Sequence, residues 1–216
     1  MKMMRWPLFL APLILLSCTE PAEKAGDEPT DGGNWIELGP ASWKPIVFGG
    51  EGITEWKDEV LSVGAGVELS GVLFDGGELP SMPYELELEA RKISGSDFFC
   101  GLTFPVSSKE ECVSLILGGW GGGTVGISSI DNQDASENET TFYEKFDDNR
   151  WYAIRVVVEA DRLQAFLDGK SIADVKTTGR KLGLRAGTIE ASAPLGLTTF
   201  QTSAEIRGIR WRSLAE

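Results

Sequence analysis

Hydrophobic and polar residues alternate one by one along several stretches of the chain. Between positions 84 and 90, four apolar side chains alternate with Glu85, Glu87 and Glu89, and residues 151–159 repeat the alternation. Successive side chains of a β-strand point to opposite faces, so a period of two predicts strands with one buried and one polar face. No stretch has the apolar period of a convincing amphipathic helix, and the pattern therefore predicts an all-β chain.

Residues typical of tight turns separate the predicted strands. Asp168 and Gly169 lie between the alternating stretches 163–167 and 171–175, and Asp-Gly is a strong signal for a two-residue hairpin turn. In the last predicted strand the apolar face switches at Gly208, which predicts a β-bulge. With 26 glycines in the chain, these signals favour an antiparallel sandwich or barrel.

The first residues have a different pattern. Lys2 and Arg5 precede an apolar run that is too short for a permanent membrane span, so residues 1–17 are predicted to be a signal peptide. The run ends at Cys18 in a motif that resembles the bacterial lipobox, in which the cysteine is lipidated and becomes the new N-terminus. An ordinary signal peptide that contains a cysteine is the alternative.

Two further segments follow. Residues 18–34 are rich in Pro, Gly and acidic side chains and are predicted to be a flexible linker, whereas residues 35–216 form the predicted domain. The residue after the lipidated cysteine is Thr19, not the aspartate that resembles an inner-membrane retention signal. We therefore expect a lipid anchor in the outer membrane, with the domain periplasmic or surface-exposed.

Charge and composition exclude several functions. The net charge is −13, which argues against nucleic acid as a partner and leaves the lipid as the expected contact with a membrane. The chain has no histidine. This excludes Ser-His-Asp and Cys-His nucleophilic sites and any histidine-ligated metal centre.

Two cysteines follow the lipobox. In an oxidising compartment, a single remaining pair is expected to form a disulfide. A hairpin that turns near Val106 would place Cys100 opposite Cys112, at a distance that a disulfide bridges. A disulfide between them is the prediction, and a metal or redox pair is the alternative.

Several stretches in order along the chain resemble motifs of the concanavalin A-like, or laminin G-like, jelly rolls. They are residues 56–61, 84–91, 149–152 with 167–170, and 206–210. Over about residues 43–214 the chain resembles domain of unknown function 1080, also called the 3-keto-disaccharide hydrolase family. The resemblance implies a jelly-roll sandwich of two antiparallel sheets and hydrolysis of 3-keto-glycosides. The chain departs from the family pattern in its short strand connections and in the cysteine-bearing hairpin.

Trp120 is the first candidate for a carbohydrate contact. Two glycines precede it and three follow it. Glycines leave the ring bare and let another surface approach the backbone closely, and an aromatic face can stack on the apolar face of a sugar. The alternative is that Trp120 fills the core and the glycines form tight turns.

Residues 131–139 hold the densest group of oxygen-bearing side chains. Calcium takes about six to eight oxygen ligands, so Asp131, Asp134 and Glu139 are candidate calcium ligands, and no other cofactor is expected. The candidate substrate contacts in this loop are Asn132, Glu137 and Asn138. The resemblance to 3-keto-disaccharide hydrolases also implies a base for a proton beside a ketone, and Asp131 or Asp134 is the candidate. A solvated acidic loop is the alternative.

Other charged residues are weaker candidates. Arg150 and Arg180 are predicted to contact substrate, and Arg155 and Arg185 are further cations for the acidic loop or a ligand, although surface cations usually have no specific role. The glutamates of residues 84–90 resemble the catalytic strand of jelly-roll glucanases, and glycoside hydrolysis needs such a carboxylate pair. Three glutamates on a solvent face are the alternative.

Three functions are compatible with these features. The first is an enzyme of the keto-glycoside kind, the second is a non-catalytic module that binds a glycan or a protein, and the third is a structural envelope domain. The residues favour binding and the family resemblance favours catalysis. The sequence therefore predicts a membrane-anchored, carbohydrate-interacting domain and leaves catalysis open.

Overall fold

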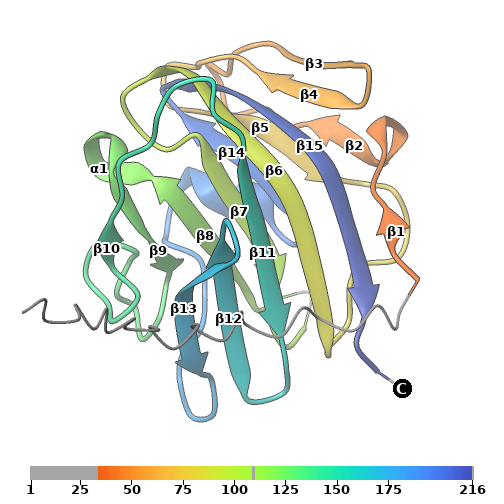
Figure 1. Cartoon of the computed structure of the whole chain (residues 1–216), viewed down its shortest axis with the longest axis vertical. Helices are drawn as coiled ribbons and strands as arrows, with labels where there is room; N and C mark the ends of the chain where they lie inside the picture. The colour runs from red at the N-terminus through yellow and green to blue at the C-terminus, as the bar shows by residue number, and fades with distance from the viewer. Residues whose placement is uncertain (1–33, 109, 216) are drawn as a thin grey trace, which may run out of the picture. The chain divides into compact units, whose positions relative to one another are not determined.

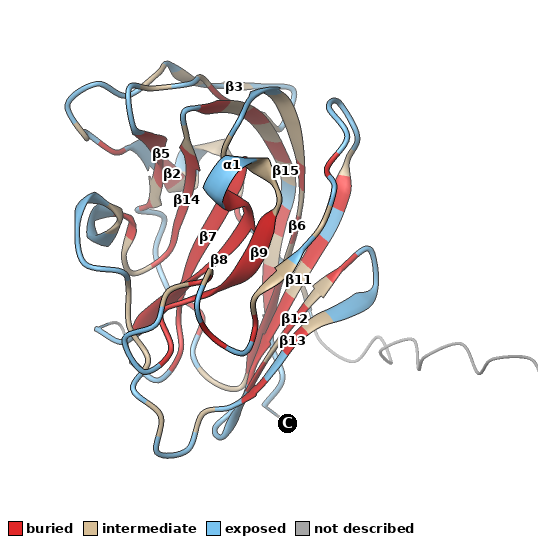
Figure 2. Cartoon of the chain, turned by 90° about the vertical axis from the view of Figure 1, so that its left-hand side faces the viewer, coloured by how far each residue is buried: buried red, intermediate tan, exposed pale blue. Residues whose placement is uncertain are grey.

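The domain is built from two antiparallel β-sheets packed face to face. The computed structural model describes residues 34–108 and 110–215. Figure 1 shows one sheet in front of the other, and Figure 2 shows them as two layers. The predicted all-β sandwich of two antiparallel sheets is confirmed. The predicted signal peptide, the predicted lipidation site Cys18 and nearly all of the predicted linker lie outside the described residues.

Sheet A is the front sheet of Figure 1. Its strands in spatial order are β13 (Lys170–Lys176), β12 (Arg162–Leu167), β11 (Tyr152–Val158), β6 (Tyr84–Gly95), β15 (Thr202–Ser213), β4 (Val60–Val63) and β3 (Thr54–Lys57), and β1 (Ile36–Glu37) also pairs with β15.

Sheet B lies behind it. Its order is β10 (Phe142–Tyr143), β9 (Thr124–Ser128), β8 (Cys112–Gly118), β7 (Cys100–Pro105), β14 (Gly196–Phe200), β5 (Leu69–Phe74) and β2 (Trp43–Pro45). The short helical turns are η1 (Pro40–Ser42), α1 (Gly119–Gly122) and η2 (Thr188–Ser192). Within the described ranges, no helix is long and apolar enough to cross a membrane.

The alternating pattern of the sequence forms the core between the sheets. Leu86 and Leu88 of β6 are buried and pair with Val156 and Ile154 of β11. This register places apolar side chains of both strands on the inner face, where they meet those of sheet B. Burial of such side chains stabilises the fold by about 1.5–3 kcal/mol each.

Two local predictions are confirmed. The turn between β12 and β13 has positive φ at both central residues, 49° at Asp168 and 77° at Gly169, as a type I′ hairpin requires. In β15 the register with β6 shifts between Arg207 and Arg210, and Gly208 has a φ of 60°. The bulge therefore lies where the apolar face switches.

The predicted disulfide is wrong. Val106 continues the pairing past its predicted turn, donating its N–H to the carbonyl of Glu111. Cys112 therefore pairs with Pro105, and Cys100 pairs with Leu117 at the other end of the hairpin. Five residues of strand separate the two positions, or roughly 16 Å at about 3.3 Å per residue, whereas a disulfide joins Cα atoms about 4.4–6.8 Å apart. No disulfide joins Cys100 to Cys112.

Both thiols are held away from their reactive form. Burial raises the pKa of Cys100 to about 12 and, with the nearby Glu110 charge, raises that of Cys112 to about 11. Because the thiolate is the nucleophile and the metal ligand, these values also disfavour the alternative of a metal or redox pair.

The outer face of sheet B is covered by loops. Thr103, Ser114 and Thr198 are all buried although they alternate with core residues along their strands. Thr103 Oγ1 lies 2.7 Å from Ser114 Oγ and 2.7 Å from Ser192 Oγ of η2. The connection from β13 to β14 therefore packs on this face, and β7, β8 and β9 are buried over most of their length (Figure 2).

The acidic loop covers the neighbouring part of the same face. A Cβ at Gly126 of β9 would lie 2.6 Å from the carbonyl oxygen of Ala135, so glycine is needed for this close approach. The backbones of Ser129 and Gly183 hydrogen bond to each other at 2.5 and 3.2 Å. These bonds link the chain just before the acidic loop, residues 131–139, to the β13–β14 connection.

Candidate functional site

Trp120 stands in the tight connection between β8 and β9. The backbone there has positive φ at Gly118, Trp120, Gly121 and Gly122, a conformation that glycine adopts at no steric cost. Asp97 fixes the turn by accepting a hydrogen bond from the Gly121 N–H at 3.2 Å. Trp120 itself adopts this conformation with its side chain 43% exposed, and the alternative that it fills the core is wrong.

The ring of Trp120 borders a depression of about 160 Å³. Its apolar lining includes Phe98, before β7, and Phe200, at the end of β14, whose ring centroids are 5.9 Å apart. The backbone N–H of Phe200 donates to the carbonyl of Phe98 and joins the two positions. The other lining residues are Leu69, Ser114, Ile116, Ser128, Arg185, Ala186, Gly187, Thr188 and Ile189.

Two polar groups of this lining are important. The hydroxyl of Ser128 is buried, with 3% of the residue exposed, and has no hydrogen-bond partner within the described chain. The Arg185 guanidinium lies 5.8 Å from the Trp120 ring centroid. Its Nε is 3.5 Å from Asp134 Oδ2. An aromatic face, a cation and an unpaired hydroxyl therefore meet in one small concave site.

Asp134 of the acidic loop contacts Arg185 of the depression lining and does not itself line the depression. Asp134 Oδ1 accepts hydrogen bonds from the backbone N–H and the hydroxyl of Ser136, at 2.9 and 2.6 Å. Its other oxygen faces Arg185. Asp134 thus lies within ion-pair distance of the arginine beside Trp120, and Arg185 is one of the cations that the sequence offers to the acidic loop or a ligand.

Asp131 and Glu139 belong to a separate cluster. Arg180 donates to Asp131 at 2.6 Å and to Glu139 at 2.7 Å. The backbone N–H of Lys181 and then Arg180 lower the pKa of Asp131, and the Arg180 hydrogen bond lowers that of Glu139. A lowered pKa makes Asp131 a weaker base, which disfavours its predicted catalytic role.

The remaining candidates of this loop are placed as follows. Asn138 is buried, and its amide group holds the loop together through bonds to the carbonyls of Ile127, Gln133 and Asp134. Asn132 accepts a bond from Lys181 Nζ at 2.7 Å, and Glu137 is exposed. In the described part of the chain, no three acidic or cysteine side chains group as metal ligands do. Calcium binding stays a prediction.

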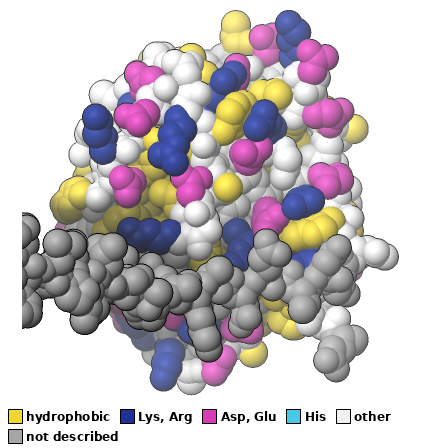
Figure 3. Space-filling model, in the orientation of Figure 1, with side chains coloured by type: hydrophobic (Ala, Val, Ile, Leu, Met, Phe, Trp, Pro, Cys, Tyr) yellow, Lys and Arg dark blue, Asp and Glu magenta, His cyan; other side chains and the backbone are white. Residues whose placement is uncertain are grey.

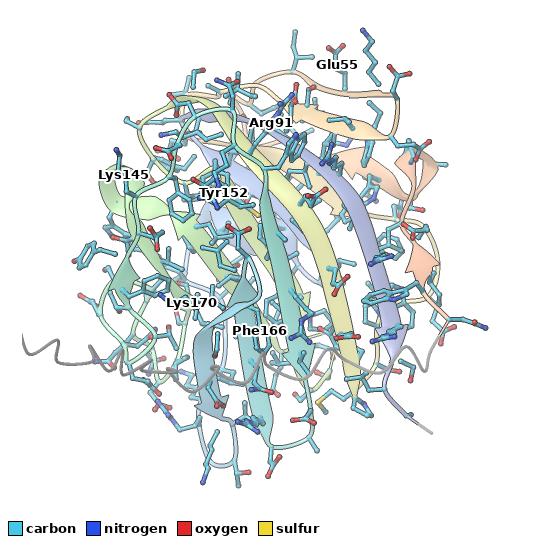
Figure 4. All side chains as sticks on the ribbon, in the orientation of Figure 1. Glu55, Arg91, Lys145, Tyr152, Phe166 and Lys170 are labelled. Carbon is cyan, nitrogen blue, oxygen red and sulfur yellow. The ribbon has the colours of Figure 1, made fainter. Side chains whose placement is uncertain are left out.

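Arg150 lies in a different cleft. It donates to Asp168 at 2.7 Å, and its guanidinium lies 4.4 Å from the ring centroid of Tyr152. Tyr152 and Lys170, both labelled in Figure 4, line this cleft of about 610 Å³ near β10. Arg150 and Trp120 therefore do not form one site.

The glutamates of β6 are paired with arginines on the outer face of sheet A. Glu87 binds Arg210 at 2.9 Å and Glu89 binds Arg207 at 2.8 Å. Glu85, only 2% exposed, binds both Arg155 and Arg212. In the part of this face that Figure 3 leaves uncovered, acidic and basic side chains are interspersed.

Tryptophans cover several of these arginines. Arg91, labelled in Figure 4, and Arg207 lie over the Trp151 ring at 4.6 and 4.1 Å from its centroid. Arg210 lies over Trp35 at 4.3 Å. Arginines of the neighbouring strands thus neutralise each of the three β6 glutamates. The face therefore does not present the free carboxylate pair that glycoside hydrolysis needs. The alternative of three glutamates on a solvent face did not include these ion pairs with arginine, although the arginines of β15 are visible in the sequence.

The sequence did not single out Phe98, Phe200 or Ser128. Each stands in a strand-like pattern, in which a residue of the core and a residue of a depression look the same. Arg185 was visible only as one of several cations, and its place beside Trp120 depends on the long β13–β14 connection.

Comparisons at the level of the sequence give no match. No protein-family model matches the sequence, and no curated protein matches it either. The resemblance to the 3-keto-disaccharide hydrolase family therefore stays a prediction.

Solved structures are similar to the described domain in fold. The carbohydrate binding module CBM66 from Bacillus subtilis has a TM-score of 0.55 and 16% identity, over 80% of this chain and 96% of that module. The Crh5 transglycosylase in its apo form has a TM-score of 0.56 and 8% identity, over 85% of each chain. At such identities the similarity shows the fold alone, a jelly-roll β-sandwich.

Proposed function

We propose that this domain is a carbohydrate-binding module that holds a sugar in the depression beside Trp120. The observation that carries the proposal is the exposed tryptophan, held by a loop with four positive φ angles next to Phe98 and Phe200. Large aromatic side chains are normally buried for their apolar area. Here the backbone presents the ring to solvent instead.

The lining matches the two kinds of surface on a sugar ring. Trp120, Phe98 and Phe200 offer apolar contact for its C–H face. Ser128 and Arg185 offer polar partners for its oxygens, and few polar groups in a mostly apolar depression are typical of small-ligand sites. The fold similarity to a module named for carbohydrate binding supports this assignment.

Binding without catalysis is favoured by the positions of the carboxylates. Asp134 is the acidic residue next to the depression, and Ser136 and Arg185 engage its oxygens. Hydrolysis of 3-keto-glycosides, which the family resemblance implies, is the alternative. It predicts turnover of such substrates that Asp131→Asn or Asp134→Asn abolishes.

The experiment is a glycan array with the purified protein, run beside a turnover assay on 3-keto-glycosides and ordinary disaccharides. We expect glycan binding that Trp120→Ala abolishes, and no turnover. Tyr143→Ala is the control, because Tyr143 is 78% exposed on β10 and does not line the depression. Turnover, or an absence of glycan binding, would contradict the proposal.

The proposal includes anchorage by a lipid on Cys18 in the outer membrane. This residue lies outside the described part of the chain, and the support is the lipobox-like end of the apolar run. Fatty-acid labelling in the producing bacterium should mark the wild-type chain and not Cys18→Ser. Labelling of both chains, or of neither, would contradict the anchor.

A further inference from the structure

The lining of the depression carries a positive charge. Among the described residues that line it, Arg185 is the charged one, and the Asp134 carboxylate lies 3.5 Å from its Nε without lining the depression. The chain as a whole carries a net charge of −13. A cation in the binding site of an acidic protein is therefore a local feature that suits a ligand of opposite charge.

The guanidinium of Arg185 has free donors. Its approach to Asp134, at 3.5 Å, is too long for a hydrogen bond, and within the described residues it makes none. Its side chain is 63% exposed. Arg180, in contrast, donates to two carboxylates at 2.6 and 2.7 Å. An arginine has five N–H donors in a planar fork that matches a carboxylate, so Arg185 keeps this capacity for a ligand.

Ser128 supplies an independent observation. Its hydroxyl is buried in the lining and has no hydrogen-bond partner among residues 34–108 and 110–215. A buried hydroxyl without a hydrogen bond costs free energy, and a ligand hydroxyl in the depression would satisfy it. The site therefore has a cation beside Trp120, Arg185, that can bind an anionic group of a ligand. It also has a hydroxyl in its lining, that of Ser128, that can hydrogen bond to a ligand hydroxyl.

We propose that the sugar bound here is acidic, a pyranose that carries a carboxylate, as a uronic acid does. The ring stacks on Trp120, the carboxylate binds Arg185, and a ring hydroxyl binds Ser128. This inference rests on the proposed carbohydrate function and names its ligand class. Long-range repulsion by the acidic surface is weak at physiological salt, where charges are screened beyond about 8 Å.

The test compares glycans that contain uronic acids with the same glycans after reduction of the carboxylate to an alcohol. Reduction removes the charge and keeps the sugar skeleton. We expect the wild-type protein to bind the acidic forms at least about tenfold more tightly, since a charge-assisted hydrogen bond is lost with the carboxylate. Arg185→Gln should remove this preference, and Arg185→Lys should retain part of it.

Arg162→Gln is the matched control. Arg162 also pairs with one aspartate, Asp174, and lies on β12 away from the depression. Arg162→Gln removes one positive charge, as Arg185→Gln does, and should leave the preference for acidic glycans intact. Thermal unfolding of each variant checks that the fold is retained.

The outcomes separate the two proposals. Equal binding of acidic and reduced glycans, abolished by Trp120→Ala, overturns the acidic-sugar inference and leaves the carbohydrate function standing. A preference that persists in Arg185→Gln overturns the role of Arg185. Binding to no glycan overturns both proposals.

Discussion

At the scale of single residues, the depression combines groups that a stable core would exclude. Ser128 buries a hydroxyl that has no hydrogen-bond partner in the described part of the chain, and Trp120 exposes a large ring on a backbone with a φ of 48°. Each feature costs stability, by an amount on the order of 1–3 kcal/mol. Such costs are expected where a protein is shaped for a ligand and not only for folding.

Ser128→Ala tests the cost of the buried hydroxyl. Because the hydroxyl has no partner to lose, we expect the free energy of unfolding to stay constant or to rise by up to about 1 kcal/mol. Denaturant unfolding without ligand measures it. A loss of more than about 2 kcal/mol would show that the hydroxyl is satisfied in the native state, and Ser114→Ala, which breaks a bond to Thr103, is the destabilised comparison.

Arg180 gives a prediction for acid stability. The pKa values of Asp131 and Glu139 are lowered from 3.8 and 4.5 in the folded protein. Carboxyl groups with lowered pKa values stabilise the fold above their unfolded pKa values, and this contribution is lost as the pH falls through the folded values. Arg180→Gln should therefore be less stable than wild type near pH 6.

The difference between the two proteins should then shrink below about pH 4, as the carboxylates are protonated in both. Unfolding curves at a series of pH values measure this. A stability difference that is constant from neutral to acid pH would show that Arg180 acts through packing instead.

At the scale of elements, two loops decide the site. The acidic loop depends on Asn138, whose side chain donates to three carbonyls and accepts from the backbone N–H and hydroxyl of Thr140. The loop in turn carries Asp134 toward Arg185. The sequence predicts that Asn138 contacts substrate, whereas the structure gives it a structural role. The site depends on Asn138 indirectly, through the position of Asp134.

Asn138→Ala should cost about 2–4 kcal/mol of stability, because several buried groups lose their partner. Glu137→Ala is the control in the same loop. The Glu137 side chain is exposed, so its loss should change stability by no more than about 0.5 kcal/mol. Equal effects of the two substitutions in thermal or denaturant unfolding would refute the structural role.

The outer face of sheet A gives a graded prediction. Glu85 and Arg212 are both buried, whereas Glu89 and Arg207 are each 41% exposed. Removing one partner of a buried pair costs about 3–5 kcal/mol, and an exposed pair contributes about 0–1 kcal/mol. Glu85→Gln should therefore destabilise the fold far more than Glu89→Gln, and similar losses of unfolding free energy would contradict this order.

At the scale of the whole molecule, local patterns determined the fold and distant contacts determined the site. The alternation of residues 84–90, the Asp168-Gly169 turn and the bulge at Gly208 depend on neighbours in sequence, and all three are confirmed. The disulfide prediction was wrong because it depended on the register of one hairpin, which Val106 extends.

The depression depends on segments that are far apart in sequence. Phe98 and Phe200 meet where β7 and β14 pair, and Trp120 comes from the β8–β9 connection. Arg185 joins them because the β13–β14 connection crosses the outer face of sheet B. No local pattern specifies that crossing. The sequence could therefore identify Trp120 from its glycines, but it could not identify the groups around it.

The most direct test of the central claim is the affinity of Trp120→Ala for the glycan that the wild type binds, measured by titration calorimetry. We expect a loss of at least about tenfold, as for a central aromatic contact, with an unchanged melting temperature because Trp120 lies outside the core. Tyr143→Ala should bind as the wild type does. Wild-type affinity in Trp120→Ala would contradict the claim that the depression beside Trp120 is the carbohydrate site.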